Sequence, residues 1–330
     1  MESSNIVLDW IAQGRVKPGH EVMALDLAGM QPKAAQWQRF IDQMLLWCGV
    51  IALGASLIFF LAYNWQSMGR FAKFGLAEAA IVFALIACWK LGLESTAGKA
   101  SLLLASLFTG ALLALVGQTY QTGADAYELF LAWAIATLTW VLLARLGAML
   151  LFWLGLVNMS VLLYFQTFGG FFGVLFSSSY QLWMMLILNA FALVVWEMAR
   201  WRGVQHLQAR WSVRVMATVV GVLVTMLMLD AIFSYGDQYR SENHVSVWLT
   251  LVSYLCWVSL SLWVYRRKVQ DLFVLAGVVL SFIITLNAWI GRQVLDHSDA
   301  GGFLLVGLMI IGSSALGGIW LKKVTQEMQA

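Results

Sequence analysis

The sequence predicts an all-α, polytopic integral membrane protein of about ten transmembrane helices, with a short cytoplasmic helical segment at the N-terminus. Three observations predict this class: composition, the length of the apolar runs and the distribution of charge. Of the 330 residues, 61% are hydrophobic and 11% are charged, whereas a soluble domain carries roughly 25% charged residues. A net charge of +3 is too small to indicate a nucleic-acid partner. The apolar composition instead indicates the lipid bilayer as the expected partner.

Apolar runs along the chain give the number of spans. A bilayer core about 30 Å thick requires roughly 20 apolar residues in a helix, because each residue adds 1.5 Å. By that measure the predicted spans are 44–63, 74–91, 101–119, 129–144, 148–165, 181–199, 215–233, 245–265, 272–290 and 303–321. Only Arg145, Leu146 and Gly147 separate the fourth run from the fifth, so these two runs could also form one long helix.

Basic residues decide between these two arrangements. With ten spans and both termini in the cytoplasm, sixteen of the twenty Lys and Arg residues lie on the cytoplasmic side and four on the other. This bias is the one expected, because cytoplasmic loops of membrane proteins are enriched in Lys and Arg. Merging the fourth and fifth spans would abolish the bias and bury Arg145 in lipid, which is costly. The sequence therefore predicts ten separate spans, with the loop around Asp125 on the outer face.

The N-terminal segment is predicted to form amphipathic helices. One helix has Ile6, Val7, Trp10 and Ile11 on one face and ends at Gly14, and a second begins after Pro32. These helices could form a small packed domain or lie on the lipid surface. No cleavable signal peptide is expected, because some forty mostly polar residues precede the first apolar run. We expect three parts, namely the N-terminal helices, a four-helix membrane domain and a six-helix membrane domain, at 1–43, 44–145 and 146–330.

Polar residues gather at the predicted outer ends of the first three spans. Glu78 is the most informative of them, because an acid roughly one to two turns inside an apolar run normally faces a partner or a water-filled crevice. The stretch GQTYQTGADAYE, residues 117–128, lies on the same face. We hypothesise that this stretch forms a lid over a crevice between the first three spans, where Glu78 meets Gln118, Tyr120 or Asn64.

Two motifs in this region resemble a family of bacterial multi-pass membrane proteins. The first span ends in LAYNWQ, with Ala62, Asn64 and Trp65, and GQTYQ is followed by the acidic Asp125 and the aromatic Tyr127. Together with LDWIAQGRV near the N-terminus, they make about the first 145 residues similar to the family named domain of unknown function 2157. The resemblance implies a bacterial inner membrane protein whose outer face looks into the periplasm, and it implies no particular activity.

These observations define a candidate cluster for ligand binding or polar contacts. It consists of Asn64, Trp65, Glu78, Gln118, Tyr120, Gln121, Asp125, Tyr127 and Glu128. Its aromatic rings could instead be ordinary interfacial anchors at the headgroup level. No cofactor and no metal site are expected, because the other outer acids and histidines lie in separate loops without metal-binding spacing, namely Glu242, His244, Asp296, His297 and Asp299.

Three classes of function are compatible with this cluster. A binding or transport protein would use Glu78 to hold a small polar solute or a lipid headgroup at a periplasm-facing crevice. A non-catalytic subunit or scaffold of an envelope complex would present the same residues to another membrane protein. A membrane-embedded enzyme is less favoured, because the sequence contains no nucleophile elbow, phosphate-binding loop or zinc-binding helix. Asn158 and Asn189, each in mid-span, are expected to join helices through hydrogen bonds.

Overall fold

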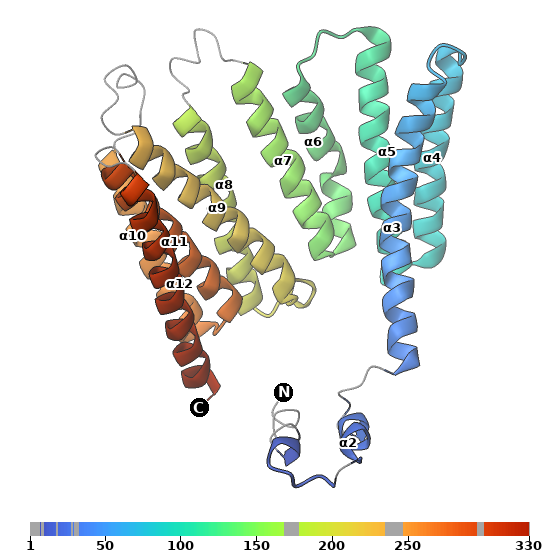
Figure 1. The fold of residues 1–330 in the computed structure, drawn as a ribbon. Coiled ribbons are helices and arrows are strands. Elements are labelled where there is room, and N and C mark those ends of the chain that lie inside the picture. Colours follow the sequence, from blue (N-terminus) through green and yellow to red (C-terminus); the bar gives the residue numbers. More distant parts are fainter. Residues whose placement is uncertain are drawn as a thin grey trace. The chain divides into compact units, whose positions relative to one another are not determined.

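The computed structural model describes residues 7, 10–17, 19–27, 29, 33–167, 178–234, 247–295 and 300–329. Ten helices in this part of the chain are long and apolar enough to cross a membrane, which confirms the predicted all-α polytopic class and the number of spans. They are shown in Figure 1 and comprise α3 (Ala34–Tyr63), α4 (Arg70–Leu91), α5 (Thr96–Tyr120), α6 (Ala126–Ala144), α7 (Gly147–Thr167), α8 (Ser178–Trp201), α9 (Arg210–Ser234), α10 (Val247–Trp263), α11 (Leu272–Leu295) and α12 (Ala300–Gln329).

Short helical segments accompany the spans, and residues 10–12 near the N-terminus are also helical. The N-terminal region contains α2 (Glu21–Leu27), the loop before α9 contains η2 (Gln205–Leu207), and α10 continues into the π-helix η4 (Val264–Lys268). The helix expected after Pro32 is the first part of α3, which begins at Ala34 and runs without a break into the first span.

The turn between α6 and α7 settles whether the fourth and fifth spans are separate. Arg145 ends α6 with a left-handed backbone, at φ 46° and ψ 44°, and α7 begins two residues later. The two helices then contact each other, since the indole Nε1 of Trp153 donates a hydrogen bond of 2.8 Å to the carbonyl oxygen of Ala134. The structure therefore confirms the two separate spans that the distribution of basic residues predicts at this position.

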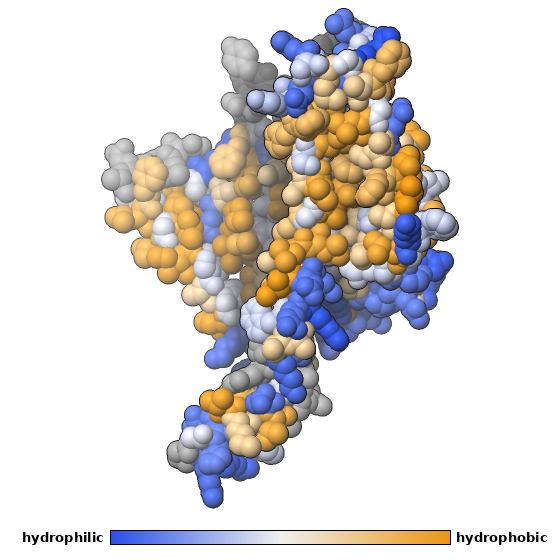
Figure 2. Space-filling model, turned by 90° about the vertical axis from the view of Figure 1, so that its right-hand side faces the viewer, coloured by the Kyte–Doolittle hydropathy of each residue, from blue (hydrophilic) through white to orange (hydrophobic). Residues whose placement is uncertain are grey.

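The chain divides into two compact units, Met1–Ala111 and Leu112–Ala330, so α5 contributes to both. The division expected from the sequence, into 1–43, 44–145 and 146–330, stays a prediction. In the first unit, Gly54 allows α3 to approach α5, because a Cβ at this position would lie 2.7 Å from Cδ1 of Leu107. Figure 2 shows that the exposed faces of the helices in this unit are mostly apolar, as expected of surfaces in contact with lipid.

Helix α9 is central in the second unit, where it packs against α8, α10 and α11 (Figure 1). Buried side chains recur along it at helical spacing, and they include Val213, Met216, Val220, Leu223, Val224 and Leu227. From Val219 onward its exposed positions are also apolar, with Val222 and Met226 at 45% and 49% exposure. Both faces are therefore suited to a lipid environment, and only packing distinguishes them.

Hydrogen bonds between polar side chains join the helices of the second unit. Asn158 of α7 and Asn189 of α8 form a reciprocal pair, with amide N to carbonyl O distances of 3.2 and 2.6 Å. This pair confirms the interhelical role expected of both residues. On average such bonds between membrane helices contribute about 0.6 kcal/mol each. A second group links α9, α10 and α11 through hydroxyls only 2.6 to 3.2 Å apart, and its members are Thr225, Tyr254, Ser281 and Thr285.

Candidate functional site

One end of the second unit carries a cluster of ion pairs, which we call the basic end. It comprises the C-terminus of α8, the N-termini of α9 and α11, and the π-helix η4. Asp271 directly precedes α11, and its Oδ1 accepts a hydrogen bond of 3.1 Å from the backbone N–H of Phe273. An aspartate in this position caps the helix and its charge is favourable at the positive end of the helix dipole. The beginning of α11 therefore fixes an acid at the basic end.

Two arginines of α9 share this acid. Arg210 donates from Nη1 to Oδ2 of Asp271 at 3.0 Å and from Nη2 to the carbonyl oxygen of Val269 at 2.6 Å. Arg214, one turn further along α9, donates from Nε to both carboxylate oxygens of Asp271 at 3.2 and 3.1 Å. The side chain of Asp271 is 2% exposed, whereas those of Arg210 and Arg214 are 39% and 44% exposed. The acid is thus enclosed while the two cations reach the surface.

The arginines keep Asp271 ionised. Burial alone would raise the pKa of this carboxyl, but the hydrogen bond and charge of Arg214 and the charge of Arg210 outweigh burial and lower the pKa below its ordinary value. Two positive charges and one negative charge therefore meet at this position.

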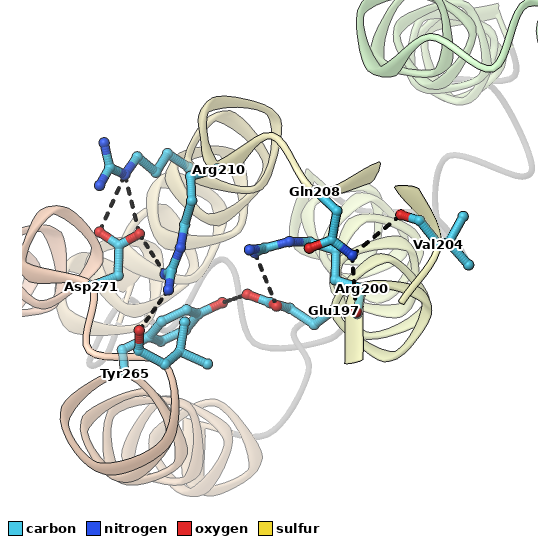
Figure 3. Close-up of polar contacts among 9 residues, drawn as sticks. Glu197, Arg200, Val204, Gln208, Arg210, Tyr265 and Asp271 are labelled. Atoms are coloured by element: carbon cyan, nitrogen blue, oxygen red, sulfur yellow. Dashed lines mark hydrogen bonds and ion pairs between the residues drawn. The ribbon is translucent and has the colours of Figure 1, made fainter. Parts of the chain in front are cut away.

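A second polar group lies beside the first at the basic end. Glu197 of α8 pairs with Arg200 at 3.4 Å and accepts a hydrogen bond of 3.2 Å from the hydroxyl of Tyr265 in η4. Figure 3 shows Tyr265 and Arg200 both directed at Glu197, with Asp271 and Arg210 next to them. The π-helix, a geometry that is often found at functional sites, positions Tyr265 for this contact. These bonds connect α8 to η4 and hold the basic end together.

An apolar groove runs from the basic end along the surface between α9 and α11. Its volume is about 510 Å³, and Trp257 of α10 contributes to its lining. The lining begins at Ala217 and Phe273 and extends to Leu229 and Ile284, which corresponds to a length of about 17 Å at 1.5 Å per residue. This length is close to that of one leaflet of the hydrocarbon core, about 15 Å.

The few polar groups along this groove are already hydrogen bonded. The hydroxyl of Thr218 donates to the carbonyl oxygen of Arg214 at 2.8 Å. Thr225 and Ser281 bond each other at 2.6 Å. Gly277 adds open space, since a Cβ built there would meet nothing within 4 Å. The groove therefore offers a mainly apolar surface whose three hydroxyl groups, those of Thr218, Thr225 and Ser281, are already bonded.

A second apolar groove lies between α10, α11 and α12. Its volume is about 450 Å³, and its lining includes Ser313, Gly317 and Trp320 of α12. The guanidinium of Arg266, at the basic end, lies 5.9 Å from the ring centroid of Trp320. Arg266 also donates from Nη2 to Glu327 at 2.7 Å. The second groove therefore also begins beside an arginine, but that arginine is bonded to an exposed acid.

The first unit contains three of the residues in the cluster predicted from the sequence. Asn64 caps α3, and its side-chain amide donates to the carbonyl oxygen of Phe60 at 3.0 Å. Trp65 lies under Lys73, with Nζ of Lys73 3.6 Å from the ring centroid. Glu78 is exposed on α4, and no hydrogen bond or ion pair reaches it from the residues that the structure describes. The structure brings Trp65 to Lys73, a residue that the sequence interpretation used only for topology.

The other six residues of that cluster lie in the second unit, at and after the end of α5. Gln118, Tyr120 and Gln121 are exposed, and the chain turns at Gln121 and Gly123, where φ is 44° and 68°. At the start of α6, Asp125 occupies the N-cap position. The hydroxyl of Tyr127 donates a hydrogen bond of 3.3 Å to the carboxylate of Glu128, and the centroid of its ring lies 5.1 Å from that of Tyr164. Because the cluster is divided between two units, the crevice hypothesis stays a prediction.

The sequence interpretation missed the basic end as a site. It counted the arginines of residues 200–214 only as topological signals, although Arg210 and Arg214 are spaced one helical turn apart. An acid immediately before an apolar run, as at Asp271, was the available signal for a helix cap. The outer acids and histidines weighed as metal ligands (Glu242, His244, Asp296, His297 and Asp299) lie outside the described residues.

Comparison with known proteins adds one match. The model of a family described as predicted membrane protein (DUF2157) matches residues 8–150, which confirms the resemblance that the N-terminal motifs indicate. No curated protein and no solved structure matches the chain. With its ten apolar helices, the chain is a multi-pass helical membrane protein. The family match ends near the start of α7, so both grooves lie in the part of the chain beyond it.

Proposed function

We propose that the protein binds a membrane lipid, one acyl chain of which lies in the groove between α9 and α11. The observation that carries this proposal is the groove itself, which is apolar, about 510 Å³ in volume and about one leaflet long. Exposed side chains along its length, such as Val222, Met226 and Leu280, show that it opens at the surface. A bilayer is the environment of this surface, so acyl chains are always present to enter it.

A polar solute fits these contacts less well than a lipid. Ligand sites for polar molecules place a few free donors and acceptors toward the ligand. The hydroxyls of Thr218, Thr225 and Ser281 are instead bonded to backbone carbonyls or to each other. Lipid binding therefore takes precedence over solute transport among the functions considered from the sequence.

The distribution of basic residues supports an orientation for this lipid. With the protein in a bacterial inner membrane and both termini in the cytoplasm, the basic end faces the cytoplasm. The groove then extends from the cytoplasmic interface toward the centre of the bilayer. Its occupant would come from the cytoplasmic leaflet.

Filling the groove tests the proposal. Gly277→Leu adds a side chain where a Cβ meets nothing, and Gly155→Leu in α7 is a matched control with equally open space outside both grooves. Both changes favour helix formation by about 1 kcal/mol, so both variants should fold. Native mass spectrometry of the purified proteins should show one lipid fewer on Gly277→Leu and an unchanged number on Gly155→Leu.

Two results would contradict lipid binding in this groove. One is equal lipid retention by both variants and by the parent protein. The other is a crosslink from a photoreactive residue at Val222 to helices α3 or α4, because the first unit would then be the occupant. The parent protein should instead crosslink to lipid at this position.

A second candidate function is that of a non-catalytic subunit of a membrane complex, and exposed Glu78 favours it. An acid that faces lipid from a membrane-spanning helix is costly unless a partner covers it. A photoreactive residue at Val82, exposed one turn away on α4, should then crosslink to another membrane protein, and Glu78→Leu should abolish the crosslink. Crosslinks to lipid or to the same chain alone would remove this candidate.

A further inference from the structure

We infer that the lipid in the groove between α9 and α11 is an anionic phospholipid, and that the guanidinium of Arg214 binds its phosphate. The inference rests on the proposed function and adds the class of lipid and the residue that selects it. Arg214 is at the basic end, where an acyl chain in the groove would place its headgroup. Neither the composition of the groove nor the family match assigns such a site.

Arg214 is available to bind an anion despite its contact with Asp271. An arginine side chain has five N–H donors. The bonds from Arg214 to Asp271 come from Nε alone, at 3.2 and 3.1 Å. The described residues provide no acceptor for its Nη1 and Nη2 groups, and its side chain is 44% exposed. Asp271 thus fixes the orientation of the guanidinium while leaving free the paired donors that suit a phosphate.

The position of Arg214 on α9 places these donors at the mouth of the groove. Ala217 and Thr218, which begin the lining, follow Arg214 by three and four residues and so lie on the same face of the helix. On the other side of the mouth, the guanidinium carbon of Arg214 lies 5.6 Å from the ring centroid of Phe273. A lipid whose chain runs along the groove would have its phosphate beside Arg214.

The charges around the mouth favour a headgroup with net negative charge. Arg210 and Arg214 together exceed the single charge of Asp271, whose lowered pKa keeps it ionised. Asp271 is 2% exposed and already accepts bonds from both arginines, so it presents no free carboxylate to a choline or ethanolamine group. Glu197 is bonded to Arg200 and Tyr265. A phosphatidylglycerol headgroup meets these charges better than phosphatidylcholine.

Competition between two lipids with identical acyl chains tests the inference. The full-length protein in nanodiscs of equal parts phosphatidylglycerol and phosphatidylcholine would be released into mild detergent and the retained lipid measured by native mass spectrometry. We expect the parent protein to prefer phosphatidylglycerol by about fivefold, the effect of one basic group near a lipid surface. Arg214→Gln should keep a lipid and lose the preference.

Two further variants make the result specific to Arg214. Arg202→Gln removes an exposed arginine of the same end whose side chain makes no hydrogen bond or ion pair with the described residues, and it should leave the preference unchanged. Arg214→Lys keeps the charge without the paired donors, so it should reduce the preference only in part and provides the comparison if Arg214→Gln is unstable. An unchanged preference in both Arg214 variants, or an equal loss in Arg202→Gln, would overturn the inference.

The outcomes also separate this inference from lipid binding itself. If the parent protein retains both lipids equally and Gly277→Leu retains one lipid fewer, the groove binds lipid but Arg214 does not select it. If neither the parent nor the variants retain a lipid, the proposed function is wrong and the inference is wrong with it.

Discussion

The two grooves of the second unit are similar in shape and differ in how their arginines are paired. Their volumes are about 510 and 450 Å³, both are lined mainly by apolar side chains, and each begins beside an arginine packed on an aromatic ring. Arg214 bonds a buried acid through Nε, whereas Arg266 bonds an exposed acid through Nη2. In the first groove the acid holds the arginine in place through Nε, and in the second it occupies Nη2, one of the paired donors that suit a phosphate.

If lipids bind as we propose, the pairing of an arginine matters for headgroup binding as well as the number of basic residues at the membrane surface. The N–H donors of the planar guanidinium point outward along its edges, and an acid at Nε leaves the edge formed by Nη1 and Nη2 free. Burial of the acid adds to the effect, because an enclosed carboxylate that is already bonded to two arginines does not present its oxygens to a headgroup. We therefore expect the first groove to select anionic lipids and the second to accept lipids regardless of charge.

The largest expected effect comes from removing the buried acid. Asp271→Asn keeps the shape of the side chain and its cap on α11, but leaves Arg210 and Arg214 without a charged partner. Hydrogen bonds to charged groups contribute about 1.5–3 kcal/mol each. We therefore expect the free energy of unfolding, measured by thermal unfolding in detergent, to fall by about 2 kcal/mol. Asp42→Asn, at an exposed acid of α3, should change the stability little.

The pH dependence of the same variant checks its physical cause. The pKa of Asp271 is lowered in the folded protein, so its stabilising contribution is complete above the ordinary pKa of about 3.9. The contribution is lost as the pH falls through the lower pKa of the folded state. The stability difference between the parent and Asp271→Asn should therefore shrink in this acidic range, and a constant difference would contradict the assigned role.

The next prediction compares the space around one glycine in the lining of each groove. A Cβ at Gly317 would lie 2.9 Å from Cγ1 of Val279 and 3.1 Å from Cδ1 of Ile283, whereas one at Gly277 meets nothing. Gly317→Leu should therefore overpack the contact of α11 with α12 and destabilise the protein by about 1–3 kcal/mol. Gly277→Leu should not lower the unfolding temperature. Equal effects of the two substitutions would show that the grooves do not differ in this way.

The sequence was sufficient to predict the helices and their number. Spans need long apolar runs, and the charge bias separated the fourth span from the fifth at Arg145, where the structure has a left-handed residue. The sequence could not predict the two grooves. The buried Val220 and the exposed Val222 of α9 are the same residue type, because lipid and protein interior are equally apolar. Periodicity of hydrophobicity therefore does not distinguish a packed face from an open one.

The polar sites show a similar limit. Asp271 meets Arg210 and Arg214 across about sixty residues of sequence, and nothing in a short motif indicates such a pairing. For Asn158 and Asn189 the prediction succeeded, because an amide in mid-span has few alternatives to bonding another helix. Glu78 was singled out for the same reason, but the structure leaves it exposed on α4, and the sequence does not identify a partner for it. The free-energy cost of placing a polar residue in an apolar run indicates that the residue needs a partner, but it does not indicate which partner.

The smallest expected effect is that of a substitution intended to make the second groove bind anionic lipids as the first is expected to do. Glu327→Gln removes the charge that pairs with Arg266 at 2.7 Å and leaves a neutral amide, so that the donors of Arg266 become available beside Trp320. Because the pair is exposed, with side chains 39% and 45% accessible, the fold should be unaffected. In the nanodisc competition the variant should retain more phosphatidylglycerol than the parent, and combining it with Arg266→Gln should remove the gain. Unchanged lipid selection in Glu327→Gln would mean that the acid does not restrict Arg266, and the contrast between the grooves would then rest on the enclosed position of Asp271 alone.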